Sequence, residues 1–229
     1  MAPRTSDHNR IIGNTAKFVL GPLGLTRRGR SRVWIDDHGW WIGIVEFQPS
    51  SWSKSTGLNL SGQFLRIETD HLAFEIQMPR PPSVPPKRVS FDPEHPERFE
   101  EYVQAVAQIA AVSVVLLRSE FGEDEALLEL LARQEGENTD VRYRKAIALG
   151  LMGDVSSAAD VLDDVAADTL RDYNERSELS HLSWMKDQAI AMRVLRDACI
   201  DRSSFASEIN RRVRSTRSEP RLPELPDRW

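Results

Sequence analysis

Uncharged polar side chains recur along the strand-like part of the chain, where they could bind a ligand. Asn59, Ser61 and Gln63 alternate with other residues in the stretch 57–67, so all three would point to the same face of a β-strand. Amide and hydroxyl groups donate and accept hydrogen bonds without carrying charge, and nearby tryptophans could add flat apolar walls. A solvent-exposed sheet face is the alternative interpretation. The candidate residues for a small-ligand or peptide site are Trp41, Gln48, Trp52, Asn59, Ser61 and Gln63.

A group of arginines precedes the first strand-like stretch. Cations interleaved with aromatic residues are typical of surfaces that bind single-stranded nucleic acid. The candidate residues for such binding are Arg27, Arg28, Arg30 and Arg32. The formal net charge of −5 and the sequence pI of about 5.6 argue against nucleic acid, because an acidic protein repels phosphate. The alternatives are a solvated loop, or a loop that pairs with acidic helices.

The segment WIDDHGWW, residues 34–41, combines acids, a histidine and a glycine. Consecutive side chains rarely converge on one ion, so we predict a hairpin turn here and no metal site. Cys199 lies in an apolar helical pattern, where a small buried hydrophobe is expected. The sequence contains no motif that indicates catalytic residues or a cofactor, and this favours a protein that is not an enzyme. A ligand-binding or enzymatic domain that uses the polar sheet face is the alternative.

Two side-chain periodicities divide the chain. A short helix is expected at 8–22, and strands are expected near 32–36 and at 40–48, 57–67 and 71–78. The second of these strands is apolar on both faces, so a helix, a tail or another subunit should cover its second side. Helices are then expected at 96–119, 123–135, 140–151, 155–167, 173–200 and 203–215.

These elements predict an α+β fold: an N-terminal antiparallel sheet of about four strands with a flanking helix, then an all-helical C-terminal half. Seven prolines in 79–96 suit neither a helix nor a central strand. The expected organisation is a sheet module at 1–78, a proline-rich connector at 79–96, a helical region at 97–215 and an irregular tail at 216–229.

Charge and composition bear on partners and location. Residues 1–91 carry 12 basic and 7 acidic side chains, whereas residues 92–201 carry 11 and 24. Residues 202–229 carry 7 basic and 4 acidic side chains, so this C-terminal tail could dock on the acidic helices of its own chain or of a neighbour. The expected partner is another protein, with homo-oligomer formation left open and with no membrane. One cysteine and the lack of a signal-peptide core indicate the cytoplasm.

Two stretches of the chain resemble known families. Leu23-Gly24-Leu25, Arg27-Arg28-Gly29, Trp34, Gln48-Pro49-Ser50 and Leu58-Asn59-Leu60 together resemble a bacterial domain-of-unknown-function family (DUF 4304-like), over about the first 80 residues. The family implies a fold and assigns no activity, so it supplies no catalytic residues. The stretch 143–165 also resembles a tetratricopeptide-type helix pair, although only one unit is visible and several are normally needed to bury a shared core.

Overall fold

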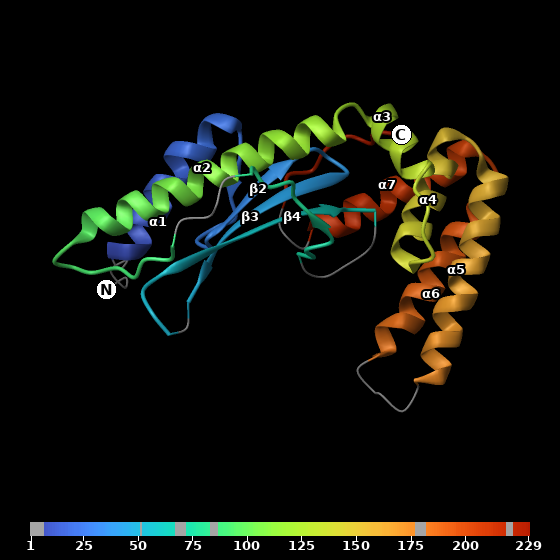
Figure 1. Cartoon of the computed structure of the whole chain (residues 1–229). Coiled ribbons are helices and arrows are strands. Elements are labelled where there is room, and N and C mark those ends of the chain that lie inside the picture. Colours follow the sequence, from blue (N-terminus) through green and yellow to red (C-terminus); the bar gives the residue numbers. More distant parts are fainter. Residues whose placement is uncertain (1–6, 51, 67–71, 83–86, 177–181, 219–221) are drawn as a thin grey trace. The chain divides into compact units, whose positions relative to one another are not determined.

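The structure is a computed structural model that describes residues 7–50, 52–66, 72–82, 87–176, 182–218 and 222–229. The chain folds into two compact units, one of residues 1–120 and 216–224 (unit 1) and the other of residues 121–215 and 225–229 (unit 2). Unit 1 holds a sheet and two long helices, and unit 2 is helical (Figure 1). The predicted α+β class is thus confirmed.

Unit 1 is built on an antiparallel sheet of five strands in the order β1-β2-β3-β4-β5. The sequence predicted about four, since β1 and β5 have two residues each and carry no alternating pattern. Most of the segment predicted as a fourth strand has no strand structure, and residue 71 lies outside the described residues. The strands are β1 (Thr26–Arg27), β2 (Val33–Asp37), β3 (Trp41–Pro49), β4 (Thr56–Phe64) and β5 (Ile76–Gln77).

The WIDDHGWW segment is the β2–β3 hairpin, as predicted. Gly39 has a φ of 87°, which a residue with a Cβ rarely adopts, and its N–H donates to Asp37 Oδ1 (3.0 Å). His38 stacks on Trp41 with ring centroids 3.9 Å apart and planes 10° apart. Its Nε2 lies 2.9 Å from Asp36 Oδ2. The histidine and tryptophan therefore brace the turn.

Both faces of β3 are buried, as its doubly apolar sequence predicted. One face is covered by α1 (Asp7–Leu20) and α2 (Pro96–Phe121), which lie along the same side of the sheet (Figure 1). The contacts that fix them are Arg32 to Asn9 Oδ1 (2.9 Å) and Arg118 to Asp36 Oδ2 (2.9 Å). The other face carries Asp37, which binds Arg217 near the C-terminus.

The proline-rich stretch packs against unit 1. Phe91 N–H donates to Lys54 O in the β3–β4 loop (2.9 Å), and the Phe91 ring meets Phe99 of α2 edge-on. Residues 83–86 of this stretch lie outside the described residues. The expected organisation therefore differs from the observed one: the stretch joins the sheet to its own covering helix, and the boundary between units falls at residue 120.

Unit 2 contains α3 (Asp124–Ala132), α4 (Thr139–Met152), α5 (Val155–Glu175), α6 (Ser183–Asp197) and most of α7 (Arg202–Ser218). Gly150 lets α4 approach α7 closely, because a Cβ there would clash with the ring of Phe205. The predicted helix 173–200 is wrong in part. α5 continues to Glu175, and residues 177–181 lie outside the described residues. The apolar register fades near residue 167, but Asp168 continues the helix through ion pairs with Arg142 and Arg171.

The C-terminal stretch after α7 has no regular structure among residues 222–229, as expected for the tail. The helix itself continues to Ser218, three residues beyond its predicted end. Arg228 pairs with Asp124 of α3, and Asn210 Nδ2 donates to Trp229 O (2.9 Å). The basic tail thus docks on an acidic helix of its own chain.

Candidate functional site

The polar residues predicted to share a sheet face have different surroundings. Ser61 and Gln63 are buried, with exposures of 2% and 1%. Ser61 Oγ donates to Ile76 O (2.8 Å), and Gln63 Oε1 accepts from Ala73 N–H (3.0 Å). Their hydrogen bonds hold the segment around β5 against β4, so neither side chain is open to a ligand.

The other four predicted residues are separated. Asn59 Nδ2 donates to Glu46 Oε2 across the strands (3.3 Å), and Gln48 is exposed near the end of β3. Trp41 is buried in the β2–β3 hairpin, whereas Trp52 is 95% exposed in the β3–β4 loop. The structure therefore brings no two of these indoles and amides together around a common cavity in the described part of the chain.

The predicted basic residues form a turn between β1 and β2. Arg27 bonds back to its own turn, donating to Ser31 O (2.6 Å) and Arg30 O (3.1 Å). Arg32 donates to Asn9 of α1, while Arg28 and Arg30 are exposed. No ion pair holds any of these four arginines among the residues that the structure describes.

A groove between α1 and α2 was not foreseen from the sequence. Its volume is about 390 Å³, and it is open to solvent. Both walls are polar: one wall comes from the first half of α1 and the other from the first half of α2. The residues that line it are Arg10, Ile11, Asn14, Thr15, Glu100, Glu101 and Gln104.

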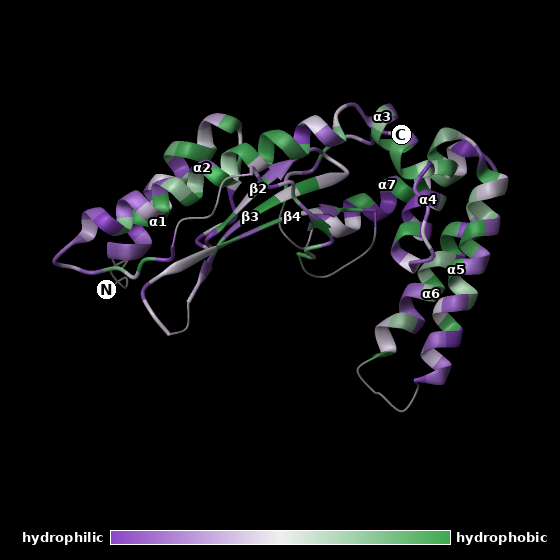
Figure 2. Ribbon diagram, viewed as in Figure 1, coloured by the Kyte–Doolittle hydropathy of each residue, from purple (hydrophilic) through white to green (hydrophobic). Residues whose placement is uncertain are grey.

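The same two helices expose large apolar side chains beyond the residues that line the groove. Arg118, near the C-terminal end of α2, donates from Nη2 to Leu23 O just after the C-terminal end of α1 (2.7 Å). The two C-terminal ends therefore lie together, and α1 and α2 run in the same direction. One turn beyond Asn14, α1 presents Phe18 at 76% exposure. On α2, C-terminal to Gln104, the side chains of Val112 (44%), Val115 (50%) and Leu116 (38%) are exposed. We call Phe18, Val112, Val115 and Leu116 the apolar end of the groove. Figure 2 shows hydrophobic residues along this part of α2.

Helix α2 explains why this surface was missed. Among the described residues it is the one helix that is long and apolar enough to cross a membrane by length and composition. One of its faces packs on the sheet as a core helix does, burying Phe99, Val103, Val106, Val114 and Leu117. The apolar residues of 105–117 do not by themselves separate the face on the sheet from an outer face. The signal that could have revealed the outer surface was the apolar residues on a second helical face.

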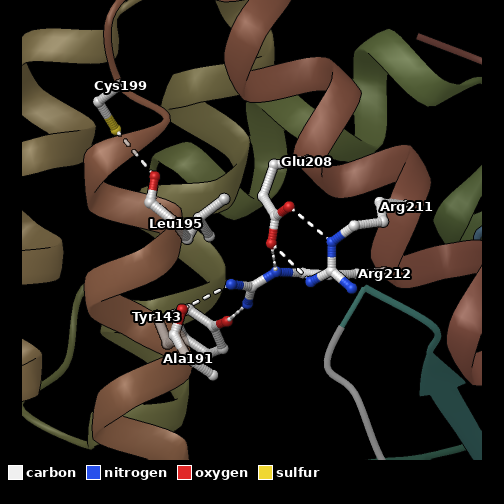
Figure 3. Close-up of polar contacts among 7 residues, drawn as sticks. All are labelled: Tyr143, Ala191, Leu195, Cys199, Glu208, Arg211 and Arg212. Carbon is white, nitrogen blue, oxygen red and sulfur yellow. Dashed lines mark hydrogen bonds and ion pairs between the residues drawn. The ribbon is translucent and has the colours of Figure 1, made fainter.

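Unit 2 contains a buried ionic cluster at the junction of α4, α6 and α7 (Figure 3). Arg212 is 1% exposed, and its Nε donates to Glu208 Oε1 (2.8 Å) while its Nη1 donates to Tyr143 Oη (2.8 Å). Its third partner is Ala191 O. The hydrogen bond from Arg211 and the neighbouring Arg212 keep the pKa of Glu208 below its ordinary value, although burial opposes this. These mutual contacts give the cluster a structural role.

Cys199 lies after α6, near this cluster (Figure 3). Its Sγ donates to Leu195 O at 3.6 Å. Burial raises the pKa of the Cys199 thiol to about 11, against the smaller opposite effect of Arg196. The thiol is therefore protonated at neutral pH and is a poor nucleophile.

A second cavity, of about 600 Å³, lies in unit 2 beside the α3–α4 loop. Part of its charged lining is paired: Arg142 Nη1 lies 2.5 Å from Asp168 Oδ2, and Arg142 Nη2 lies 3.6 Å from Asp164 Oδ2.

Neither a metal centre nor a known relative identifies the protein. Among the described residues, no group of three or more His, Cys, Asp or Glu side chains could hold a metal ion. Comparisons of the chain with family models, with curated proteins and with solved structures found no match.

Proposed function

We propose that the chain is a non-enzymatic protein-interaction module, and that an amphipathic helix of its partner docks along the groove between α1 and α2. The observation that carries the proposal is that the two helices which form the groove also expose four large apolar side chains C-terminal to it, those of Phe18, Val112, Val115 and Leu116. Contiguous exposed apolar surface beside polar residues is typical of protein-binding surfaces.

The shape and the chemistry of the groove support a helical partner. Two helices running side by side leave a channel that a third helix can fill, with its apolar residues spaced three and four apart. Apolar residues of the partner would cover Phe18, Val112 and Val115. At the polar end, Glu100 and Glu101 would favour amide or basic side chains on the partner, beside Arg10, which pairs with Asp7.

A library of displayed helical peptides with one randomised face tests this proposal. Peptides selected on the full chain are labelled, and their affinities are measured by fluorescence anisotropy. We expect amphipathic sequences whose affinity falls at least about tenfold on Val112→Glu/Val115→Glu, because each carboxylate would be buried against apolar atoms. Leu130→Glu is the matched control, since Leu130 is 44% exposed on α3 in unit 2. Peptides that bind both variants alike would refute the groove.

We place the protein in the cytoplasm as part of the same proposal. The chain has one cysteine, and its thiol is held protonated, so it offers no internal disulfide. Self-association is the competing use of the groove. Light scattering would detect it as a dimer mass that Val112→Glu/Val115→Glu reduces to the monomer mass, and that result would replace the helical partner by a second copy of the chain.

A further inference from the structure

Three segments that are distant in sequence meet at one end of the sheet in unit 1. The β1–β2 turn is fixed to β3 by Phe47 N–H, which donates to Arg32 O (3.0 Å). The β3–β4 loop is fixed to the proline-rich stretch by Phe91 N–H, which donates to Lys54 O (2.9 Å). Arg32 and Lys54 both act on His8 in the first turn of α1. The turn and the loop therefore form one surface, which we call the basic end.

Cations dominate the basic end. Arg28, Arg30 and Lys54 are exposed, and Arg32 is half-buried. The described residues include no ion-pair partner for any of these four side chains. Other arginines of the described chain do form ion pairs, among them Arg118, Arg142, Arg196 and Arg217.

The electrostatics of this surface agree with an excess of positive charge. Burial and then the charges of Arg32 and Lys54 lower the pKa of His8. Burial and then the charge of Arg27 lower the pKa of Arg32. In each case the neighbouring charges that act are positive, so a bound anion would relieve repulsion that the folded chain leaves uncompensated.

Several carboxylates of unit 1 already have hydrogen-bond partners. Glu46 Oε2 accepts from Asn59 Nδ2 (3.3 Å), and Asp92 Oδ1 accepts from Glu94 N–H (2.9 Å). Asp7 pairs with Arg10 at 3.5 Å. Arg28, Arg30 and Lys54 are exposed to solvent, whereas Arg32 is half-buried and donates to Asn9.

Trp52 adds a flat apolar surface beside the cations. Its side chain is 95% exposed, and Ser50 Oγ accepts hydrogen bonds from Trp52 N–H (3.3 Å) and from Ser53 N–H (3.2 Å). Because the indole of Trp52 is exposed, it contributes little to the packing of this chain. It is placed to stack on a planar group from outside.

We propose that the basic end binds single-stranded nucleic acid, with phosphates on Arg28, Arg30 and Lys54 and a base stacked on Trp52. Single strands are favoured over duplexes because only an unpaired base can lie flat on an exposed indole. They are favoured over an acidic protein because carboxylates would use the cations and leave the indole without a partner.

The probe is a fluorescein-labelled oligothymidine of about 20 nucleotides, titrated with the full chain and followed by anisotropy. We expect binding at about 20 mM KCl that weakens with salt, with a slope of log K against log salt near −2, as for about three phosphate contacts to a single strand. Duplex DNA of the same length should bind more weakly.

Two variants separate the parts of the surface. Arg28→Glu/Arg30→Glu should weaken binding more than about tenfold and flatten the salt slope, because it removes phosphate contacts. Trp52→Ala should weaken binding roughly five- to hundredfold and leave the slope unchanged, because stacking releases no ions. All three side chains are exposed, so circular dichroism should show an unchanged fold.

The matched control is Lys186→Glu/Arg193→Glu, which makes the same change of charge on exposed positions of α6. It should leave affinity within about twofold. The proposal is overturned by an absence of binding at low salt, or by an equal loss in the control. It is also overturned if the chain self-associates through the basic end at low salt without oligonucleotide, since an acidic protein surface would then be its partner.

Discussion

Asp36 and Asp37 are consecutive residues of β2, yet each binds an arginine from a different and distant part of the chain. Asp36 accepts two hydrogen bonds from Arg118 of α2, and Asp37 accepts two from Arg217 at the end of α7. Successive side chains of a strand point to opposite faces, so the two pairs fasten segments to both sides of the sheet. In each pair the arginine fork meets both carboxylate oxygens, which is the strongest geometry for such a contact.

Asp36→Asn should therefore destabilise the protein substantially. Asp36 is 3% exposed, and removing its negative charge leaves Arg118 of α2 without a counter-ion. We expect the free energy of unfolding to fall by about 3 kcal/mol in urea denaturation. Asp7→Asn, which breaks the exposed pair with Arg10, should cost less than about 1 kcal/mol. Equal effects of the two substitutions would show that the buried pair does not anchor α2.

The same pair predicts a dependence of stability on pH. Burial opposes the charge of Asp36, but hydrogen bonds from His38 and Arg118 prevail, and the pKa of Asp36 lies below its ordinary value. A carboxyl with a depressed pKa stabilises the fold above its unfolded pKa of about 4, and this stability is lost as pH falls through the lower folded pKa. Urea midpoints measured from about pH 5 down to pH 2 should fall more steeply for the wild type than for Asp36→Asn. Parallel pH profiles would contradict this.

Arg211 and Arg212 offer a comparison in unit 2, since both bind Glu208 but only Arg212 is buried and also bonds to Tyr143 and Ala191. The Arg212 side chain is 1% exposed and that of Arg211 is 49% exposed. We expect Arg212→Met to lower the free energy of unfolding by about 3 kcal/mol, because Glu208 and Tyr143 lose their buried partner. Arg211→Met should cost less than about 1 kcal/mol. Equal free energies of unfolding for the two variants, in both thermal and urea denaturation, would contradict this ranking.

The cysteine provides a chemical test of burial at the end of α6. Because the pKa of Cys199 is about 11, its thiolate is scarce at pH 7 to 8. We expect its reaction with a disulfide reagent to be far slower than that of glutathione at pH 8, and to accelerate up to about pH 11. Reaction of the native protein at the rate of glutathione would show that Cys199 is an accessible and ordinary thiol.

Much of the fold follows from local patterns. The hairpin at Asp36–Gly39, the first helix and the alternating strands were all predicted, because turn chemistry and side-chain period act over a few residues. β5 was not predicted as a two-residue strand, since its pairing depends on Ser61 and Gly62 of another strand. The continuation of α5 past residue 167 was missed because charged contacts sustain it there.

The candidate surfaces were harder to predict. Ser61 and Gln63 have the spacing of an open polar face, but burial beneath a distant segment cannot be inferred from strand periodicity. Trp52 was placed with the wrong neighbours: it lies in the β3–β4 loop, apart from Ser61 and Gln63, and the β1–β2 turn is fixed to β3 at the same end of the sheet. The groove could not be predicted, because it depends on α1 and α2 lying side by side in the same direction. That arrangement is seen in a long-range contact, the hydrogen bond from Arg118 to Leu23 O.

The central claim is that a protein partner covers the apolar end of the groove. The most direct measurement places a photo-crosslinking amino acid at Val115 or at Leu130 in cells that make the protein. Both positions are on helices and are similarly exposed, at 50% and 44%. We predict a discrete crosslinked product at position 115 that is lost when Phe18→Glu is added, and no such product at position 130. The same product from both positions, or none from position 115, would contradict the account.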